Sequence, residues 1–347
     1  MTDDLHIRIE GRAGRITLDR PKALNALTYP MVTAIEAALD NWRAADIDLV
    51  LIDAAGDKAF CAGGDIAEMY ASGQRGDLDY GRQFWRDEYR LNAKIFHYPK
   101  PVVTFLQGFT MGGGVGVGCH GTHRIVGESS QIAMPECGIG LVPDVGGSLM
   151  LALAPGRLGE FLGVTGFRMG PGDAIHAGFA DHFLPESEWD ALKARLVETG
   201  DVETIAAAAR PASEGTLPGW QAEIDAHFGA DTLGDILRGL PKDPGPAMTE
   251  ALKAVKRNAP LAMACCIQIV RRVRGAPGIA RALDQEFRYT FRSVAQGDFI
   301  EGIRAAIIDR DRRPRWAHTH WTDLKDAEVT QMLLPLGRDA LQLEETE

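Results

Sequence analysis

Phe60-Cys61-Ala62-Gly63-Gly64-Asp65-Ile66 is a glycine-rich turn between a run of apolar strand formers, 49–53, and a helical pattern for which Asp65 is the expected N-cap. Met111-Gly112-Gly113-Gly114-Val115-Gly116 repeats the arrangement after a second β-rich run, 101–107. Such turns leave backbone N–H groups unpaired, where they hold an oxygen that carries negative charge. The order of strand, turn and helix predicts an α/β fold with a ligand at the carboxyl ends of its strands.

A third segment supplies acids. Ala133-Met134-Pro135-Glu136 runs on to Val142-Pro143-Asp144-Val145-Gly146-Gly147 and brings two carboxyl groups into a short apolar stretch. A solvated acid is expected among polar neighbours, whereas these two stand among Ile132, Ile139 and Leu141. Two anion-binding turns and a carboxylate pair predict an acyl-transfer or enolate site rather than a binding surface.

Taken together, these motifs resemble the enoyl-CoA hydratase/isomerase (crotonase) superfamily, and within it the hydrolases that act on 3-hydroxyisobutyryl-CoA. The likeness begins at Leu18-Asp19-Arg20-Pro21-Lys22-Ala23-Leu24-Asn25-Ala26-Leu27 and returns at Leu162–Arg168 and Gly297–Ala305. Residues 185–260 carry little of it. The resemblance implies a crotonase-like β/α spiral core, residues 1–187, followed by a mainly helical C-terminal region, residues 188–347.

The same resemblance assigns site residues. The N–H groups of Ala62 and Gly113 would form the oxyanion hole of a thioester reaction. Glu136 would be either the nucleophile or the base that activates water, and the sequence leaves these two open. Asp144 would bind the substrate's 3-hydroxyl or assist proton movement. The remaining expected substrate contacts are Glu88, Gly64, Asp65, Lys22 and Leu24, of which Glu88 reads equally well as an exposed charge on a helix over 81–96.

Position 116 separates hydrolysis from hydration. Hydratases of the superfamily carry a second glutamate at the position of Gly116 and a glycine at that of Asp144. The replacement of both favours hydrolysis over hydration. The resemblance then implies a thioesterase that releases coenzyme A from a short 3-hydroxyacyl-CoA, with 3-hydroxyisobutyryl-CoA of valine degradation as the substrate and 3-hydroxypropionyl-CoA as a second one. A hydratase or isomerase that uses Glu136 alone is the second hypothesis, and an acyl-CoA-binding subunit without turnover is the third.

Composition agrees with an enzyme of small molecules. The net charge of −11 over 347 residues argues against nucleic acid as the main partner. No apolar run approaches the roughly 18 residues of a membrane span, and the acidic start, residues 1–4, is unlike a leader peptide, so the cytoplasm is expected. No resident cofactor is expected, because coenzyme A enters with the substrate; a homo-oligomer stays open.

Three further patterns are interpreted as structural. The five cysteines, at 61, 119, 137, 265 and 266, have no C-x-x-C spacing, which indicates neither a disulfide framework nor a zinc site. Gly116-x-Gly118-x-x-Gly121 satisfies the dinucleotide-binding pattern, but these glycines fall inside the helix expected to begin at Gly113 rather than directly after a strand. His120 and His123, three apart on the same expected helix, lack a third ligand. No metal is predicted.

Overall fold

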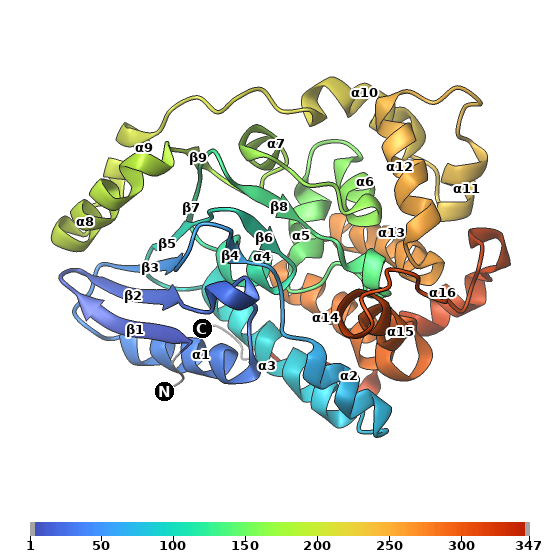
Figure 1. Cartoon of the computed structure of the whole chain (residues 1–347), viewed down its shortest axis with the longest axis horizontal. Coiled ribbons are helices and arrows are strands. Elements are labelled where there is room, and N and C mark those ends of the chain that lie inside the picture. The colour runs from blue at the N-terminus through green and yellow to red at the C-terminus, as the bar shows by residue number, and fades with distance from the viewer. Residues whose placement is uncertain (1–3, 344–347) are drawn as a thin grey trace.

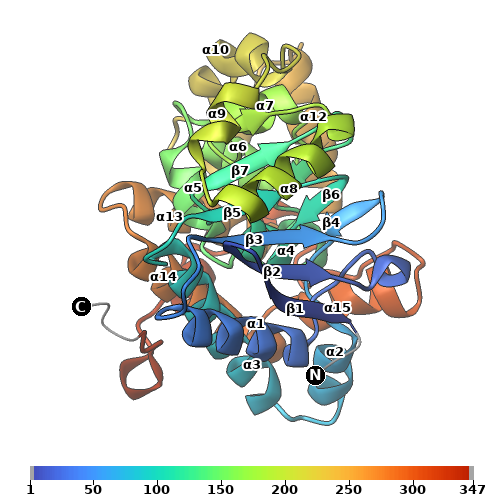
Figure 2. The ribbon, with the colours of Figure 1, turned by 90° about the vertical axis from the view of Figure 1, so that its left-hand side faces the viewer.

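The computed structural model describes residues 4–343, so the acidic start at 1–3 lies outside the described part. Two sheets form the α/β half of the molecule (Figures 1 and 2). The larger sheet has six strands in the order β1-β2-β3-β5-β7-β9, antiparallel between β1 and β2 and parallel elsewhere. Its strands are β1 Leu5–Glu10, β2 Ala13–Leu18, β3 Leu49–Ala54, β5 Val102–Phe105, β7 His123–Val126 and β9 His182–Phe183.

The smaller sheet carries the site. Its three parallel strands, in the order β4-β6-β8, are β4 Ala59–Cys61, β6 Phe109–Met111 and β8 Gln131–Ala133. Each strand ends directly before one of the segments singled out in the sequence: the turns that begin at Ala62 and Gly112, and Met134-Pro135-Glu136. Because carboxyl ends of parallel strands meet at one edge of a sheet, the three segments come together there.

Helices of the first half cover these sheets: α1 Tyr29–Trp42, α2 Ala67–Gln74, α3 Asp79–Phe96, α4 Gly113–Gly118, α5 Gly147–Leu153, α6 Leu158–Thr165 and α7 Pro171–His176. Two details differ from expectation. Asp65 is not the cap of α2, whose N-cap is Ile66 without a side-chain bond. Helix α4 ends at Gly118, so Gly121, His120 and His123 lie beyond it rather than on it.

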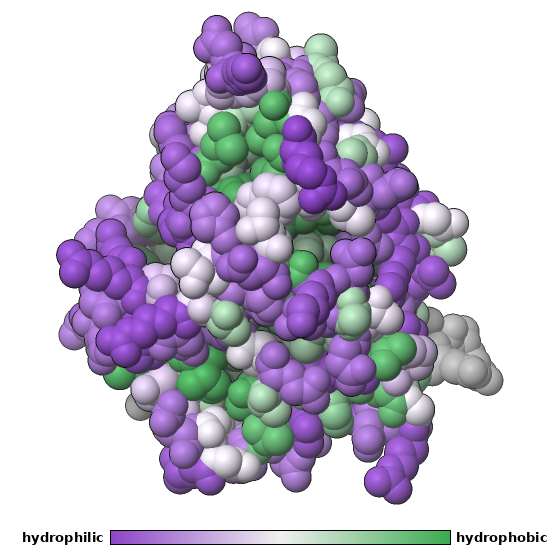
Figure 3. All heavy atoms as spheres, turned by 90° about the vertical axis from the view of Figure 1, so that its right-hand side faces the viewer, coloured by the Kyte–Doolittle hydropathy of each residue, from purple (hydrophilic) through white to green (hydrophobic). Residues whose placement is uncertain are grey.

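The second half is helical, as expected: α8 Trp189–Thr199, α9 Glu203–Ala208, α10 Leu217–His227, α11 Leu233–Arg238, α12 Pro246–Arg257, α13 Pro260–Arg274, α14 Ile279–Gln296, α15 Phe299–Ile303 and α16 Asp326–Met332. A π-helical turn, Arg304–Ile308, extends α15. The face that carries α11, α12 and α16 is mostly hydrophilic, with apolar side chains in small patches (Figure 3). Apolar side chains of α13 and α14 join the buried cluster that α1 and α3 begin. The boundary at 187/188 stays a prediction, because the core runs across it.

No helix in the described residues is long and apolar enough to cross a membrane.

Candidate active site

A cavity of about 240 Å³ lies where the three strand ends of the smaller sheet meet α2 and α3. Its polar lining combines the two glycine turns with three carboxyl side chains: Ala62, Gly63, Gly64, Gly112, Gly113, Glu88, Glu136 and Asp144. Its apolar lining comes from both halves of the chain, with Ile66, Met69, Phe84 and Trp85 from the first and Phe299 and Ile307 from the second. The sequence therefore predicted the polar side of the cavity but not the part of its wall that the C-terminal region supplies.

Glu136 opens a short 3-10 turn after β8, and this turn directs its side chain toward the glycines of the second turn. Its Oε1 lies 2.9 Å from the position that a Cβ on Gly112 would take, and Gly112 has φ +49, so glycine alone suits this position. Only 4% of Glu136 is exposed, and its Oε2 has no hydrogen-bond partner among the described residues. Burial, and then the nearby Asp144, raise the pKa of Glu136 well above its usual value.

Asp144 is also buried, but it has a hydrogen-bond partner. Tyr89 of α3 donates its hydroxyl to Oδ2 of Asp144 over 2.8 Å. Burial raises the pKa of Asp144 to about 7, and the bond from Tyr89 opposes that rise because it stabilises the ionised form. Tyr89 was not singled out in the sequence, where an aromatic residue on an amphipathic helix signals only a core position.

Glu88 lies one residue before Tyr89, on the buried face of α3. It is 4% exposed, which decides against the exposed-charge interpretation. Its Oε1 lies 3.0 Å from the position of a Cβ on Gly113. Burial, followed by the charge of Asp144, raises the pKa of Glu88 well above its usual value. Three buried acids thus share one cavity, and Asp144 is the one that ionises most readily near neutral pH.

The hydrogen bonds of the first glycine turn correct one predicted residue. The N–H of Ala62 donates to the carbonyl oxygen of Leu24 over 3.0 Å, so it is not free to bind a ligand. In the described structure the N–H groups of Gly64 and Gly113 donate to no oxygen. A Cβ on Gly113 would stand 3.2 Å from the nitrogen of Gly64, so the two residues lie next to each other in the lining of the cavity. Gly64, expected only as a substrate contact, replaces Ala62 as the partner of Gly113.

The other predicted contacts lie apart from the carboxyls. Asp65 does not line the cavity, because its carboxylate faces Arg20 at 3.2 Å. Lys22 and Leu24 line a separate cavity of about 250 Å³, which Lys58 and Asn25 also border. The bond from Ala62 to Leu24 connects this second cavity to the first glycine turn.

Position 116 has no room for a side chain. A Cβ on Gly116 would stand 2.6 Å from Nδ2 of Asn92 and 2.8 Å from Cβ of Val145. The amide could turn aside, but the Val145 contact requires the main chain to move. Val145 directly follows Asp144, so the segment that brings the new acid also fills the place of the missing glutamate. Asn92, fully buried and without a side-chain partner among the described residues, is another neighbour that the sequence did not reveal.

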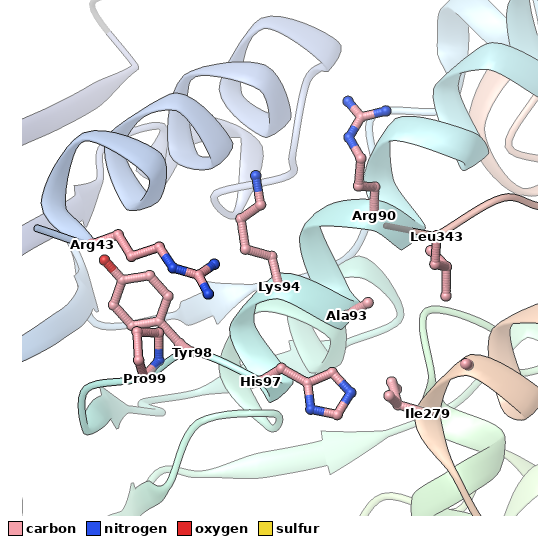
Figure 4. Close-up of a pocket in the computed structure, with 10 residues that line it drawn as sticks. Arg43, Arg90, Ala93, Lys94, His97, Tyr98, Pro99, Ile279 and Leu343 are labelled. Atoms are coloured by element: carbon pink, nitrogen blue, oxygen red, sulfur yellow. The ribbon is translucent and has the colours of Figure 1, made fainter. Parts of the chain in front are cut away.

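Two other features do not belong to this site. Cys61 and Cys137 are buried, and burial raises the pKa of the Cys61 thiol to about 12, so the reactive thiolate is suppressed. A larger cavity of about 470 Å³ lies beside α3 and the start of α14 (Figure 4). None of the described residues that line it carries a carboxyl side chain, and two of its cations, Arg90 and Lys94, are paired with Glu36 at 2.6 and 3.1 Å.

Comparison with known proteins gives one consistent family. The model of the enoyl-CoA hydratase/isomerase family matches residues 13–333. The protein named 3-hydroxyisobutyryl-CoA hydrolase, mitochondrial, is 35% identical in Gallus gallus, over 98% of this chain and 91% of the relative. The protein of that name in Danio rerio is 37% identical, over 96% and 90%. These relatives confirm the resemblance that the motifs indicated.

Solved structures agree on the fold. The crystal structure of an enoyl-CoA hydratase from Rhodobacter sphaeroides 2.4.1 is 55% identical, covers 98% of this chain and 100% of its own, and has a TM-score of 0.95. That of a carnitinyl-CoA dehydratase from Mycobacterium thermoresistibile is 37% identical, covers 99% and 100%, and has a TM-score of 0.94. The two curated relatives are named hydrolases, and the two solved structures are titled hydratase and dehydratase. All four nevertheless resemble this chain over nearly its whole length. The chain belongs to the enoyl-CoA hydratase/isomerase family.

Proposed function

We propose that this protein hydrolyses the thioester of a short 3-hydroxyacyl-CoA to a 3-hydroxy acid and free coenzyme A, with 3-hydroxyisobutyryl-CoA of valine degradation as main substrate. The observation that carries the proposal is the placement of Glu136 and Asp144, both buried, beside the free N–H groups of Gly64 and Gly113. The hydrolase relatives support the choice of substrate.

The two N–H groups form the proposed oxyanion hole. When the thioester carbon is attacked, its oxygen becomes negative, and two preplaced donors stabilise it without reorganisation. Coenzyme A leaves as a thiolate, and because a thiol has a pKa near 8.5 it needs less protonation than an amine. The acyl end of the substrate then lies against the apolar wall around Trp85 and Phe299.

Glu136 acts on the carbonyl by one of two routes. In the first, its carboxylate attacks the thioester carbon, the C–S bond breaks, and an acyl anhydride forms; water then cleaves the anhydride and restores Glu136. In the second, Glu136 takes a proton from water, which attacks directly. A single turnover in ¹⁸O-labelled water tests the first route, because label in the Glu136 carboxyl can come only from an anhydride opened by water at its glutamyl carbon. Label in the product acid alone is given by direct attack of water and also by an anhydride opened at its acyl carbon.

Either route needs an ionised Glu136, whose pKa is raised. Because a proton does not pass favourably to a group of lower pKa, the proposed acceptor of the Glu136 proton is solvent water. Asp144, with a pKa of about 7, is the proposed proton donor to the departing thiolate, whose thiol has the higher pKa. The same carboxyl is placed to bind the substrate's 3-hydroxyl. The cavity at Lys22, Leu24 and Lys58 is the proposed path of the remainder of coenzyme A, with its phosphates near the two ammonium groups. No resident cofactor is proposed, the cytoplasm remains the proposed location, and a homo-oligomer remains open.

Hydration of an enoyl-CoA is the second candidate, favoured by the solved structure of the hydratase at 55% identity. Against it stand the contacts of Gly116, which leave no room for a second glutamate there. One assay decides: free thiol and the enoyl absorbance are followed together on 3-hydroxyisobutyryl-CoA and crotonyl-CoA. Thiol release from the first with slow loss of the enoyl chromophore from the second supports hydrolysis. Fast hydration without thiol release overturns it.

A further inference from the structure

The turn that carries Asp144 adopts an unfavourable backbone conformation. Val145 has φ +54 and Gly146 has φ +80, and the left-handed region is costly for a β-branched residue such as valine. Such a conformation persists only where surrounding groups hold it. Among the described residues, one backbone hydrogen bond spans the turn, from the N–H of Gly147 to the carbonyl oxygen of Asp144 at 2.7 Å.

The strongest of the outside contacts comes from the C-terminal region. Glu286 of α14 is completely buried, and its two carboxyl oxygens face the turn from 138 to 140 residues further along the chain. Oε2 accepts the N–H of Gly146 at 2.8 Å, and Oε1 accepts the N–H of Ser148 at 3.0 Å and its hydroxyl as well. Nothing in the described structure pairs Glu286 with a cation.

Two further bonds complete the surroundings of the turn. Nε2 of His120 lies 2.7 Å from the carbonyl oxygen of Val145, and Tyr89 donates to the Asp144 carboxyl. Burial lowers the pKa of His120 to about 4, so near neutral pH the imidazole is uncharged and donates from Nε2. The turn is therefore held from α3, from the segment after α4 and from α14.

We propose that Glu286 is a positioning residue of the active site, which acts through the Asp144–Ser148 turn to hold the Asp144 carboxyl where it meets Tyr89 and the substrate. The inference rests on the proposed function for its kinetic test but not for its structural one. It extends the site into the C-terminal half, to a side chain that does not line the cavity.

The chemistry of Glu286 supports a role beyond packing. Burying a carboxyl without a cation is unfavourable, and burial raises its pKa to about 8 despite the three bonds that it accepts. A short polar side chain at the N-cap, such as serine or aspartate, would pair the N–H groups at the start of α5 at a lower cost in free energy. The carboxyl of Glu286 contacts Gly146 and Ser148 at the same time, on both sides of Gly147. It therefore fixes the direction of the turn in addition to pairing its N–H groups.

The test is a kinetic double-mutant cycle with Glu286→Gln and Asp144→Asn. Glutamine is nearly the same size, but its amide group would present N–H donors to the N–H of Gly146 or Ser148. If Glu286 acts through Asp144, Glu286→Gln lowers kcat for 3-hydroxyisobutyryl-CoA by about tenfold or more in the parent and by less than about twofold in Asp144→Asn. Ser148→Ala, which removes one of the three bonds, gives a smaller loss with the same dependence on Asp144 and serves if Glu286→Gln does not fold.

Glu160→Gln is the matched control, because Glu160 of α6 is equally buried but bonds to Arg274 of α13 rather than to the Asp144–Ser148 turn. It should lower thermal stability while leaving kcat within about twofold in both backgrounds. A crystal structure of Glu286→Gln gives a second measurement, in which Asp144 is expected to leave the Tyr89 hydroxyl.

The inference is overturned if Glu286→Gln lowers kcat equally in the parent and in Asp144→Asn, or if it lowers kcat in neither. It is also overturned if Asp144 keeps its position in the crystal structure of Glu286→Gln. If the parent releases no thiol from any 3-hydroxyacyl-CoA, the proposed function fails, and the position of Asp144 in the variant crystal structure still decides the role of Glu286.

Discussion

The two halves of the chain contribute different things to one cavity. The α/β half supplies every group proposed to act on the thioester: the N–H groups of Gly64 and Gly113 and the carboxyls of Glu136 and Asp144. The helical half supplies part of the apolar wall and the carboxyl of Glu286 behind the Asp144 turn. The difference teaches that the reacting groups are set by short local motifs, whereas their exact placement depends on packing between segments far apart in sequence.

The largest expected effect tests whether chemistry resides in the first half. Glu136→Gln keeps the shape of the side chain but removes the nucleophile or base, so turnover should fall at least about a thousandfold, near 4 kcal/mol, while substrate still binds. Thiol-release kinetics and a binding titration on the same preparation measure both. A loss below tenfold would show that Glu136 has another role.

A second change tests the pair of N–H donors. The added methyl group of Gly113→Ala would lie 3.0 Å from Glu88 Oε1 and 3.2 Å from the nitrogen of Gly64, in the path of the developing oxyanion. We expect kcat/KM to fall about a hundredfold, the scale of losing one oxyanion donor. Gly219→Ala on α10 is the control for replacing glycine in a helix, because the added methyl group would contact no neighbouring group within 4 Å. Equal activity of the two variants would remove Gly113 from the site.

The third prediction concerns recognition by Asp144. If its carboxyl binds the 3-hydroxyl, Asp144→Asn should narrow the preference for 3-hydroxyisobutyryl-CoA over isobutyryl-CoA by about tenfold, because a badly paired hydroxyl costs roughly 1–3 kcal/mol. Steady-state kinetics on this matched pair measure the ratio. Equal losses on both substrates would instead assign Asp144 to the chemical step.

The raised pKa of Asp144 also predicts how stability depends on pH. Folding raises this pKa from 3.8 to about 7, so the folded state binds the proton more tightly and loses stability as pH rises from about 4 to 7. Asparagine has no proton to lose. The unfolding free energy of Asp144→Asn, relative to that of the parent, should therefore increase by about 1 kcal/mol or more from pH 4 to pH 8. Denaturant titrations at both pH values check this; a constant difference would contradict it.

The smallest effect is expected from the helical half. Phe299 is fully buried and packs against Trp85 with 5.7 Å between ring centroids. Phe299→Leu keeps an apolar wall with less contact, so KM should rise about threefold while kcat stays within about twofold. A kcat loss as large as that of Gly113→Ala would erase the proposed division between the two halves.

The fold and most of the polar cavity were predictable, because glycine turns after strands and a buried acid pair have local signatures. That Gly64 rather than Ala62 offers the free N–H group was not predictable, since it depends on the hydrogen bond from Ala62 to Leu24, 38 positions apart in the sequence. The burial of Glu88 depends on which face of α3 packs inward, and both faces of that helix contain acids. Glu286 carries no sequence signal, because its partners, two backbone N–H groups and the hydroxyl of Ser148, lie 138 to 140 positions earlier in the chain.

Because three buried carboxyls line one cavity, the site binds protons as well as substrate. With the pKa values of Glu88 and Glu136 well above their usual range, the empty cavity retains protons that water would otherwise remove. A substrate that changes their surroundings changes how many are held, so binding takes up or releases protons. Affinity then depends on pH even for an uncharged acyl group, and the heat of binding changes with the ionisation enthalpy of the buffer.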